Sequence, residues 1–139
     1  MKINQDIATL LLRLGLSGSL LSAVASRLGL WGQRSSGWQG FVKYTAEVNS
    51  FLPNTWAPAL AIGATILETA FGIMLLAGFK IPYAAIGTAA LTFLFAVAMS
   101  ISGSVKDPLD YSVFAFSAGA LLLYTMPAGR WSLDSLFHL

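Results

Sequence analysis

Long stretches of apolar residues dominate the pattern of hydrophobic and polar positions along this chain of 139 residues. A membrane-spanning helix needs ~20 mostly apolar residues. Windows that reach or approach this length cover residues 7–29, 57–79, 81–103 and 109–126, the last being the shortest. The alternating pattern of about ten residues that marks barrel strands does not occur, so each window is predicted to be a helix. The pattern therefore predicts an all-α integral membrane four-helix bundle that forms a single domain, residues 1–139.

The connection between the first two windows is long and has a pattern of its own. Apolar residues recur in it at helical spacing, and polar or charged residues fall between them. This pattern predicts an additional amphipathic helix over about residues 36–51, in the first external loop, lying on the membrane surface or roofing the bundle. A role as an anchoring cover is enough to explain it. The apolar positions are Trp38, Phe41, Val42, Val48, Phe51 and Leu52.

Composition supports the membrane assignment and excludes several kinds of site. Hydrophobic residues make up 56% of the chain and charged residues 10%, whereas soluble domains carry about 25% charged residues. There is no cysteine, which excludes disulfides, thiol cofactors and thiolate metal sites. His138 is the single histidine, so neither a haem nor a zinc site is expected. The net charge of +2 is small and the basic residues are scattered, so nucleic acid is not an expected partner.

Charge alone does not orient the chain in the membrane. Three basic residues fall on the predicted side of the termini and four on the other side, a margin too small for the positive-inside rule. Four spans nevertheless place both termini on one side. The first group is Lys2, Lys80 and Arg130, and the second is Arg27, Arg34, Lys43 and Lys106.

A single carboxylate interrupts the second window, in the stretch TILETAFGIMLL. Glu68 lies eleven residues from either end of the window, or ~16 Å at ~1.5 Å per residue. This depth is close to the midplane of a hydrocarbon core ~30 Å thick. An ionised carboxylate there costs several kcal/mol unless it is paired, so we expect Glu68 to face the bundle interior.

Arg13, in the first window, is the predicted partner of Glu68. The two residues differ by ~7 Å in depth if the spans are antiparallel, and a long arginine side chain covers much of that distance. Ser17 shares a helix face with Arg13, and Thr65 shares one with Glu68. The predicted intramembrane polar site is therefore Arg13, Glu68, Ser17 and Thr65. It is either a structural link between two helices or a site for a proton, an ion or a polar headgroup, and the sequence leaves both readings open.

Four further residues are candidates for the mouth of this site. Tyr44 and Glu47 belong to the predicted amphipathic helix and are within reach of the end of the bundle, although such residues more often form a solvated face. Asp110 and Tyr111 open the fourth window. Asp110 is already explained as an acid in the first turn of a helix, where it favours the helix dipole, so a role in the site is its less favoured reading.

With these residues in place, the chain resembles the DoxX family of small four-span membrane proteins. LLLRLGLSGSLL resembles the family's opening span with its intramembrane arginine, and FVKY, residues 41–44, resembles an F-x-x-Y motif in the first external loop. LETAFGIMLLAGFK resembles the pattern of the second span, DYSVFAFSAGALLL that of the fourth, and PAGRWSLD that of the C-terminal tail. The chain departs from the family near the end of the first span. Many members have G-x-x-K there, whereas this chain reads SAVASRLGLWG.

The resemblance implies four helices, a bacterial inner (cytoplasmic) membrane and cytoplasmic termini. It also implies an association with oxidoreductases, because some relatives are membrane subunits of thiosulfate:quinone oxidoreductase and others accompany enzymes of oxidative stress. The family's role is not uniform. Its more distant thiol-redox branch is excluded here by the absence of cysteine.

The leading interpretation is an accessory membrane subunit of a redox system that holds a quinone or another lipid-like molecule near Arg13 and Glu68. Arg13 would donate to a carbonyl oxygen, and Glu68 would orient Arg13 or pass a proton. The alternative is a non-enzymatic membrane scaffold or a protein that binds a small solute or a partner. No autonomous catalytic motif is visible, so the chain is at most a membrane subunit of an oxidoreductase. The expected partners are the lipid bilayer, a quinone, a protein of a redox complex and a second copy of the chain.

Overall fold

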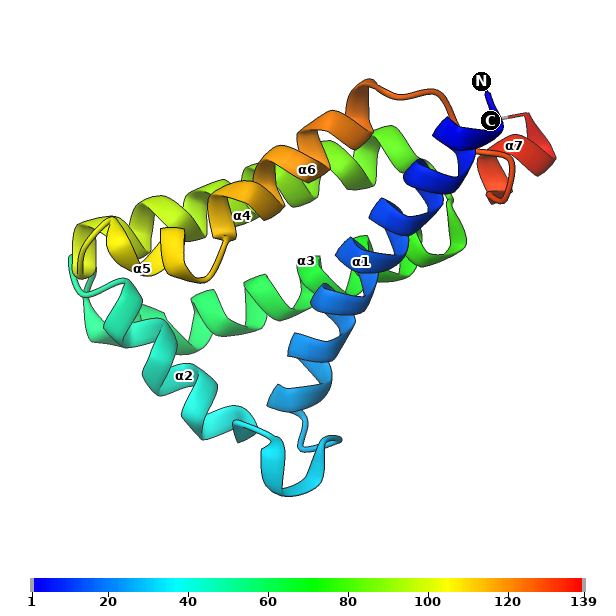
Figure 1. Ribbon diagram of the computed structural model, residues 1–139. Helices are drawn as coiled ribbons and strands as arrows, with labels where there is room; N and C mark the ends of the chain where they lie inside the picture. Colours follow the sequence, from blue (N-terminus) through cyan, green and yellow to red (C-terminus); the bar gives the residue numbers. More distant parts are fainter. Residues whose placement is uncertain (1, 139) are drawn as a thin grey trace.

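The computed structural model describes residues 2–138, and every regular element in this part of the chain is a helix (Figure 1). Three helical stretches are long and apolar enough to cross a membrane, and a shorter apolar helix follows them. The predicted all-α membrane bundle is thus confirmed. The helices are α1 Ile3–Arg27, α2 Gly37–Val48, α3 Ala57–Ala77, α4 Ile81–Ser102, α5 Lys106–Asp110, α6 Val113–Thr125 and α7 Leu133–Phe137, with 3-10 turns at Gly32–Arg34 and Asn54–Trp56.

The long helices alternate in direction, and both ends of the chain lie at the same end of the bundle (Figure 1). Helix α4 packs along α6 and, across a tight turn, against α3, while α1 crosses α3 obliquely and diverges from the rest of the bundle. Helix α2 lies across the space that this divergence leaves. The buried core is built mainly from leucine and alanine at the end of the bundle near the termini. Its members are Leu16, Leu20, Leu75, Ile81, Ala84, Ala85, Ala89, Ala120 and Leu123.

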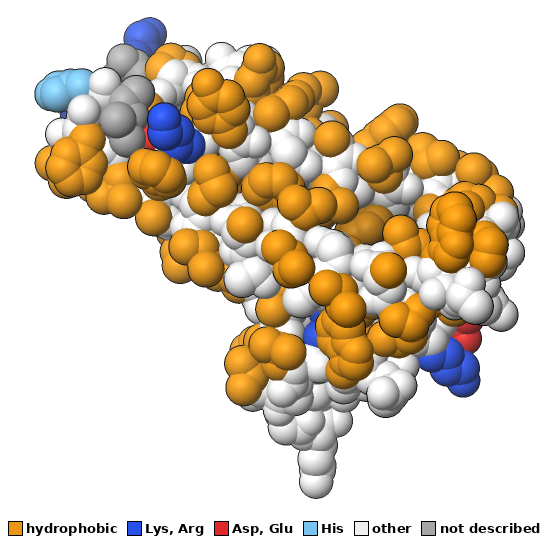
Figure 2. Space-filling model, turned by 180° about the vertical axis from the view of Figure 1, so that it is seen from behind, with side chains coloured by type: hydrophobic (Ala, Val, Ile, Leu, Met, Phe, Trp, Pro, Cys, Tyr) orange, Lys and Arg blue, Asp and Glu red, His pale blue; other side chains and the backbone are white. Residues whose placement is uncertain are grey.

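Small residues set how closely the helices approach. A Cβ at Gly72 would lie 2.8 Å from Leu21, and one at Gly87 would lie 2.4 Å from the ring of Phe71. These glycines therefore permit the contacts of α3 with α1 and α4, as small residues do between membrane helices. Large apolar side chains point outward instead. Figure 2 shows hydrophobic side chains spread along the whole length of one face of the molecule, as expected of a surface in contact with lipid.

The amphipathic helix α2 lies close to the predicted residues 36–51. The buried side of this helix includes Thr45, whose exposed fraction is 6%, and Lys43 and Glu47 are exposed. Its C-terminal end is tied to the end of α4, because the hydroxyl of Ser102 donates to the carbonyl of Val48 over 2.6 Å. Phe41, in the first half of α2, contacts Arg27 at the end of α1. The helix therefore bridges the diverging parts of the bundle.

The fourth apolar window differs from a single continuous helix. Helix α5 ends at Asp110, Ser112 adopts a left-handed conformation with φ of 59°, and α6 begins at Val113. Left-handed backbone is unfavourable for a residue with a Cβ, and the break therefore needs local support. The amide of Ser112 donates to the carbonyl of Leu109, and the Ser112 carbonyl accepts from Phe116. Helix α6 alone is ~20 Å long, so a fourth complete crossing stays a prediction.

The C-terminal segment is anchored on the turn between α3 and α4. Gly78 ends α3 with φ of 72°, and a Cβ there would lie 2.5 Å from the Cβ of Ser132. The carboxylate of Asp134 accepts from the backbone amides of Lys80 at 2.6 Å and Ile81 at 2.7 Å. These amides begin α4 and have no partner within the helix. Asp134 thus satisfies the start of one long helix while the tail packs against the end of another.

Candidate functional site

Glu68 lies in the middle of α3 and is 5% exposed. Its partner is Arg27, the last residue of α1, which is 6% exposed. Nη1 of Arg27 and Oε2 of Glu68 form a salt bridge, and the same nitrogen donates to the hydroxyl of Thr65 over 3.0 Å. Thr65 and Glu68 lie on one face of α3. The ion pair therefore joins the end of α1 to the centre of α3.

The predicted pair between Arg13 and Glu68 is wrong. Arg13 is buried, with 2% exposure, but each of its three guanidinium nitrogens donates to a backbone carbonyl. Nε donates to Leu75 over 2.9 Å, Nη2 to Leu76 over 3.3 Å and Nη1 to Trp131 over 3.0 Å. The last carbonyls of a helix lack partners within it and carry partial negative charge. Arg13 consequently caps α3 and holds the C-terminal tail.

The crossing of α1 over α3 explains why the partner is different. The prediction treated the two spans as antiparallel helices matched in depth. In the structure Arg13 meets the C-terminal end of α3, Leu21 meets Gly72 and Arg27 meets Glu68. About fourteen residues of α1 therefore face about seven of α3. This becomes possible when the helices cross at an angle and long arginine side chains at both ends of the contact reach inward.

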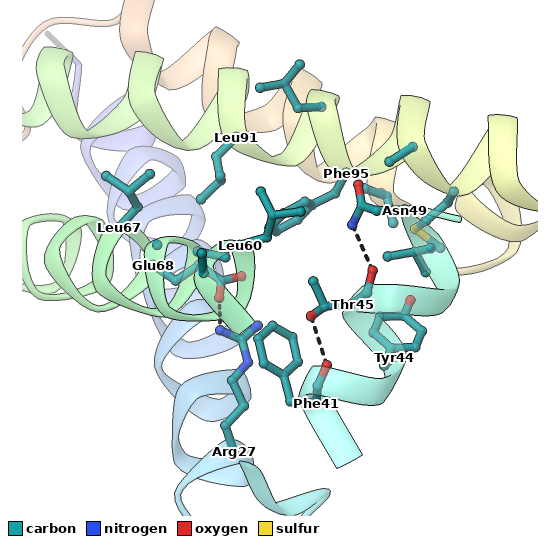
Figure 3. Close-up of a pocket in the computed structure, with 18 of the residues that line it drawn as sticks. Arg27, Phe41, Tyr44, Thr45, Asn49, Leu60, Leu67, Glu68, Leu91 and Phe95 are labelled. Carbon is teal, nitrogen blue, oxygen red and sulfur yellow. Dashed lines mark hydrogen bonds and ion pairs between the residues drawn. The ribbon is translucent and has the colours of Figure 1, made fainter. Parts of the chain in front are cut away.

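The Arg27–Glu68 pair borders a cavity of about 640 Å³ between α2, α3, α4 and the start of α6. Figure 3 shows Arg27 reaching from α1 to Glu68, with the Phe41 ring of α2 beside its guanidinium group. Most of the lining is apolar. The apolar lining residues are Phe41, Val48, Ala59, Leu60, Gly63, Ala64, Leu67, Leu91, Leu94, Phe95, Ala98, Met99 and Val113, and the polar ones are Arg27, Tyr44, Thr45, Asn49, Glu68 and Tyr111.

The guanidinium group of Arg27 has donors left over at this cavity. Its Cζ lies 3.6 Å from the centroid of the Phe41 ring, a cation–π contact that restrains the group. In the described part of the chain, Nε and Nη2 have no hydrogen-bond acceptor. Among residues 2–138, the only side-chain polar atom that is fully enclosed by protein and lacks a hydrogen-bond partner is Thr88 Oγ1. Nε and Nη2 of Arg27 lack a partner but are not such atoms, so they are not fully enclosed by protein. Arg27 can therefore donate to a molecule in the cavity.

Two of the other polar groups that line the cavity donate hydrogen bonds to backbone carbonyls of α2. The hydroxyl of Thr45 donates to the carbonyl of Phe41 over 2.8 Å, and the side-chain amide of Asn49 donates to the carbonyl of Thr45 over 2.9 Å. Tyr44 and Tyr111 line the cavity and are 46% and 75% exposed, so they lie toward its opening. Partial burial, together with nearby Tyr111, Asp107 and Glu47, raises the pKa of Tyr44 above its ordinary value, so its hydroxyl remains protonated and can donate.

The remaining predicted site residues lie apart from the cavity. Ser17 is fully buried and donates to the carbonyl of Leu14 over 3.3 Å. Glu47 is exposed and does not line the cavity, and Asp110 forms an exposed ion pair with Lys106 one turn away. Of the eight predicted residues, the structure brings Glu68, Thr65, Tyr44 and Tyr111 to the cavity or to the ion pair at its edge.

The residues that sequence reasoning missed are Arg27 and the buried side of α2. Arg27 was counted among the charges outside the membrane. It lies fourteen residues after Arg13, which is close to four helical turns and places both arginines on one face of α1. It also belongs to the segment SAVASRLGLWG, where the family's G-x-x-K is missing, so a basic residue is present in this region of the span after all. Phe41 and Thr45 carried no signal beyond helical spacing.

The geometry permits hydrogen bonding to a bound molecule and proton exchange with a carboxylate. Among residues 2–138, no group of three or more histidine, aspartate or glutamate side chains is placed to hold a metal ion.

Comparison with known proteins found a match to the family model named DoxX over residues 8–101. No curated protein and no solved structure matches the chain.

Proposed function

Because the chain belongs to the DoxX family of membrane proteins, we propose that its cavity binds a lipid-like molecule with a polar head, in a membrane subunit of a redox system. One observation carries this proposal. A buried arginine with unused donors, held by Glu68 and Thr65, borders a cavity that is otherwise mainly apolar. Such a combination of apolar walls and a few convergent polar groups is typical of small-molecule sites.

The dimensions and lining of the cavity suit an amphipathic guest. A volume of about 640 Å³ falls inside the range of roughly 300–1,000 Å³ found for ligand pockets. Leucine, phenylalanine and methionine side chains offer contacts to an isoprenoid or acyl chain. Arg27 would donate to a carbonyl oxygen of the head, the role first expected of Arg13, and Glu68 would orient Arg27 or pass a proton. A quinone has both the required carbonyl and the required tail.

Entry from the bilayer fits the exposed part of the lining. Leu67 on α3 and Leu94 on α4 line the cavity and are 43% and 63% exposed. A guest that leaves the hydrocarbon phase beside these leucines remains in apolar surroundings until its head reaches Arg27. The assignment to a redox system rests on the resemblance of the chain to DoxX proteins rather than on any residue of the cavity.

Extraction of the purified protein tests the proposal. Protein isolated in mild detergent should release a quinone or another lipid-like molecule in near-stoichiometric amount, and a quinone would change its ultraviolet spectrum on reduction with borohydride. Leu60→Trp places a large ring in the cavity lining and should abolish retention. Ile62→Trp is the matched control, because Ile62 lies two residues away on α3, is 50% exposed and does not line the cavity.

The comparison of the two variants decides the outcome. Equal amounts of bound molecule in Leu60→Trp and Ile62→Trp would mean that the molecules belong to the surrounding lipid shell, and the cavity proposal would fail. A clean protein that retains one dedicated protein partner would favour the alternative of a membrane scaffold. Thermal unfolding of both variants in detergent checks that each is folded when the extraction is made.

A further inference from the structure

We infer that the cavity selects molecules whose polar head is neutral and carries a hydrogen-bond acceptor, and that it discriminates against anionic heads. This inference rests on the proposed function and adds the chemical class of the guest. It starts from the charge balance of the site. Arg27 and Glu68 are the only charged residues that line the cavity in the described part of the chain, and they are joined in one salt bridge.

The paired charges remove most of the attraction that an arginine offers to an anion. A guest oxygen within hydrogen-bonding distance of Nε or Nη2 of Arg27 lies beside the Glu68 carboxylate as well, because the same guanidinium group contacts both. At ~6 Å and an effective dielectric constant of ~20, the repulsion between two negative charges corresponds to roughly 100-fold in affinity. An anionic head would also lose its hydration on entering the site.

A neutral acceptor avoids both costs. The guanidinium group is always charged and presents its N–H donors in a fixed plane. The contact with Phe41 restrains the group, and Nη1 is already occupied by Glu68 and Thr65. The two unused nitrogens can thus donate to the carbonyl oxygen of a neutral head, and the positive charge of Arg27 strengthens that hydrogen bond. Two sources supply this chemistry, namely a quinone and the ester groups of an uncharged glycerolipid.

Calorimetric titration of the full chain in a non-ionic detergent tests the inference with three probes. These are a short-chain benzoquinone, dioctanoylglycerol and the anionic lipid dioctanoyl phosphatidylglycerol. Pairing with Glu68 cancels most of the attraction of Arg27 for an anion, and the lost hydration of a charged head outweighs what remains, so we expect at least one neutral probe to bind about tenfold or more tightly than the anionic probe. Binding of the quinone alone or of both neutral probes identifies the source, and either result supports the inference. Tighter binding of the anionic probe to the wild-type protein would overturn it.

Glu68→Gln provides the decisive variant. It preserves the shape of the side chain and an acceptor for Arg27 but leaves the positive charge unbalanced. Affinity for the anionic probe should then rise by roughly 100-fold. Glu47→Gln is the matched control, since it alters the net charge equally on an exposed residue outside the cavity lining, and it should leave the order of affinities unchanged. No gain for the anionic probe in folded Glu68→Gln would contradict the inference.

A double variant covers the case in which Glu68→Gln does not fold. Arg27→Gln with Glu68→Gln leaves no unpaired charge, and it should bind the neutral probes more weakly than wild type with no gain for the anionic probe. A gain for the anionic probe in this neutral site would overturn the inference.

Failure of this inference can be distinguished from failure of the proposed function. If wild type prefers the anionic probe and Leu60→Trp abolishes that binding, the cavity remains a lipid site with a different selectivity, whereas binding of no probe would remove the proposed function itself.

Discussion

A pair of double-mutant cycles would establish which arginine is coupled to Glu68. One cycle combines Arg27→Met with Glu68→Met, and the other combines Arg13→Met with Glu68→Met. The structure predicts strong coupling in the first cycle, because each single change strands the opposite charge in a buried site. It predicts additive effects in the second, because Arg13 binds backbone carbonyls at the end of α3 and not Glu68.

The magnitudes follow from the contacts that are lost. Breaking a buried ion pair costs ~3–5 kcal/mol in soluble proteins, while hydrogen bonds between membrane helices average ~0.6 kcal/mol in one well-studied case. Arg27 makes two such contacts and Arg13 makes three. We therefore expect each arginine variant to lose about 1–4 kcal/mol of unfolding free energy. Coupling between Arg27 and Glu68 should reach about 1–3 kcal/mol, as found for residues in direct contact.

Coupling between Arg13 and Glu68 should stay within about 0.5 kcal/mol. Their contacts on α3 are seven residues, or ~10 Å, apart, and effects of sites at such separations usually add. Reversible unfolding in mixed micelles, followed by tryptophan fluorescence, measures all five variants on one scale. Strict additivity for Arg27 with Glu68, or coupling above about 1 kcal/mol for Arg13 with Glu68, would refute the assignment of partners.

Two further predictions concern the anchored C-terminal tail. Gly78→Ala should lower the unfolding free energy by more than ~1–2 kcal/mol, because it adds a Cβ to left-handed backbone and drives that Cβ against the backbone of Ser132. The control is Gly18→Ala, in open space within α1, which should be neutral or stabilising in the same assay. Asp134→Asn should lower the unfolding free energy by about 1–2 kcal/mol, because one of the two carboxylate oxygens that accept from the amides at the start of α4 is lost. A loss no larger than that of Asp110→Asn, at an exposed position, would contradict the role of Asp134 as the cap of α4.

The fold class was predictable because its physical cause is local in the chain. Apolar stretches of about twenty residues must form helices in lipid whatever their neighbours are. The same reasoning indicated that Glu68 faces inward. It did not reveal the break at Ser112, because a serine in left-handed conformation is stabilised by contacts of the surrounding turn and carries no sequence signal of its own.

The pairing of charges was not predictable, because it depends on the angle between two helices. Arg13 and Arg27 share one face of α1, so the sequence offers two candidates for Glu68. Matched antiparallel spans favour Arg13. Because the helices cross obliquely, Glu68 pairs with Arg27, and Arg13 donates to the carbonyls at the end of α3 instead. A crossing angle is set by side-chain packing along the whole contact, including the close approach at Gly72, and one sequence does not specify it.

Photolabelling tests the central claim, that the cavity beside Arg27 and Glu68 holds a lipid-like molecule. A short-chain quinone carrying a diazirine would be activated with the wild-type protein in lipid nanodiscs, and adducts would be mapped by mass spectrometry. We predict adducts on cavity residues such as Leu60, Leu91 and Phe95, lost on addition of excess unmodified quinone. Adducts spread over the outward face of the helices and insensitive to that competitor would contradict the account.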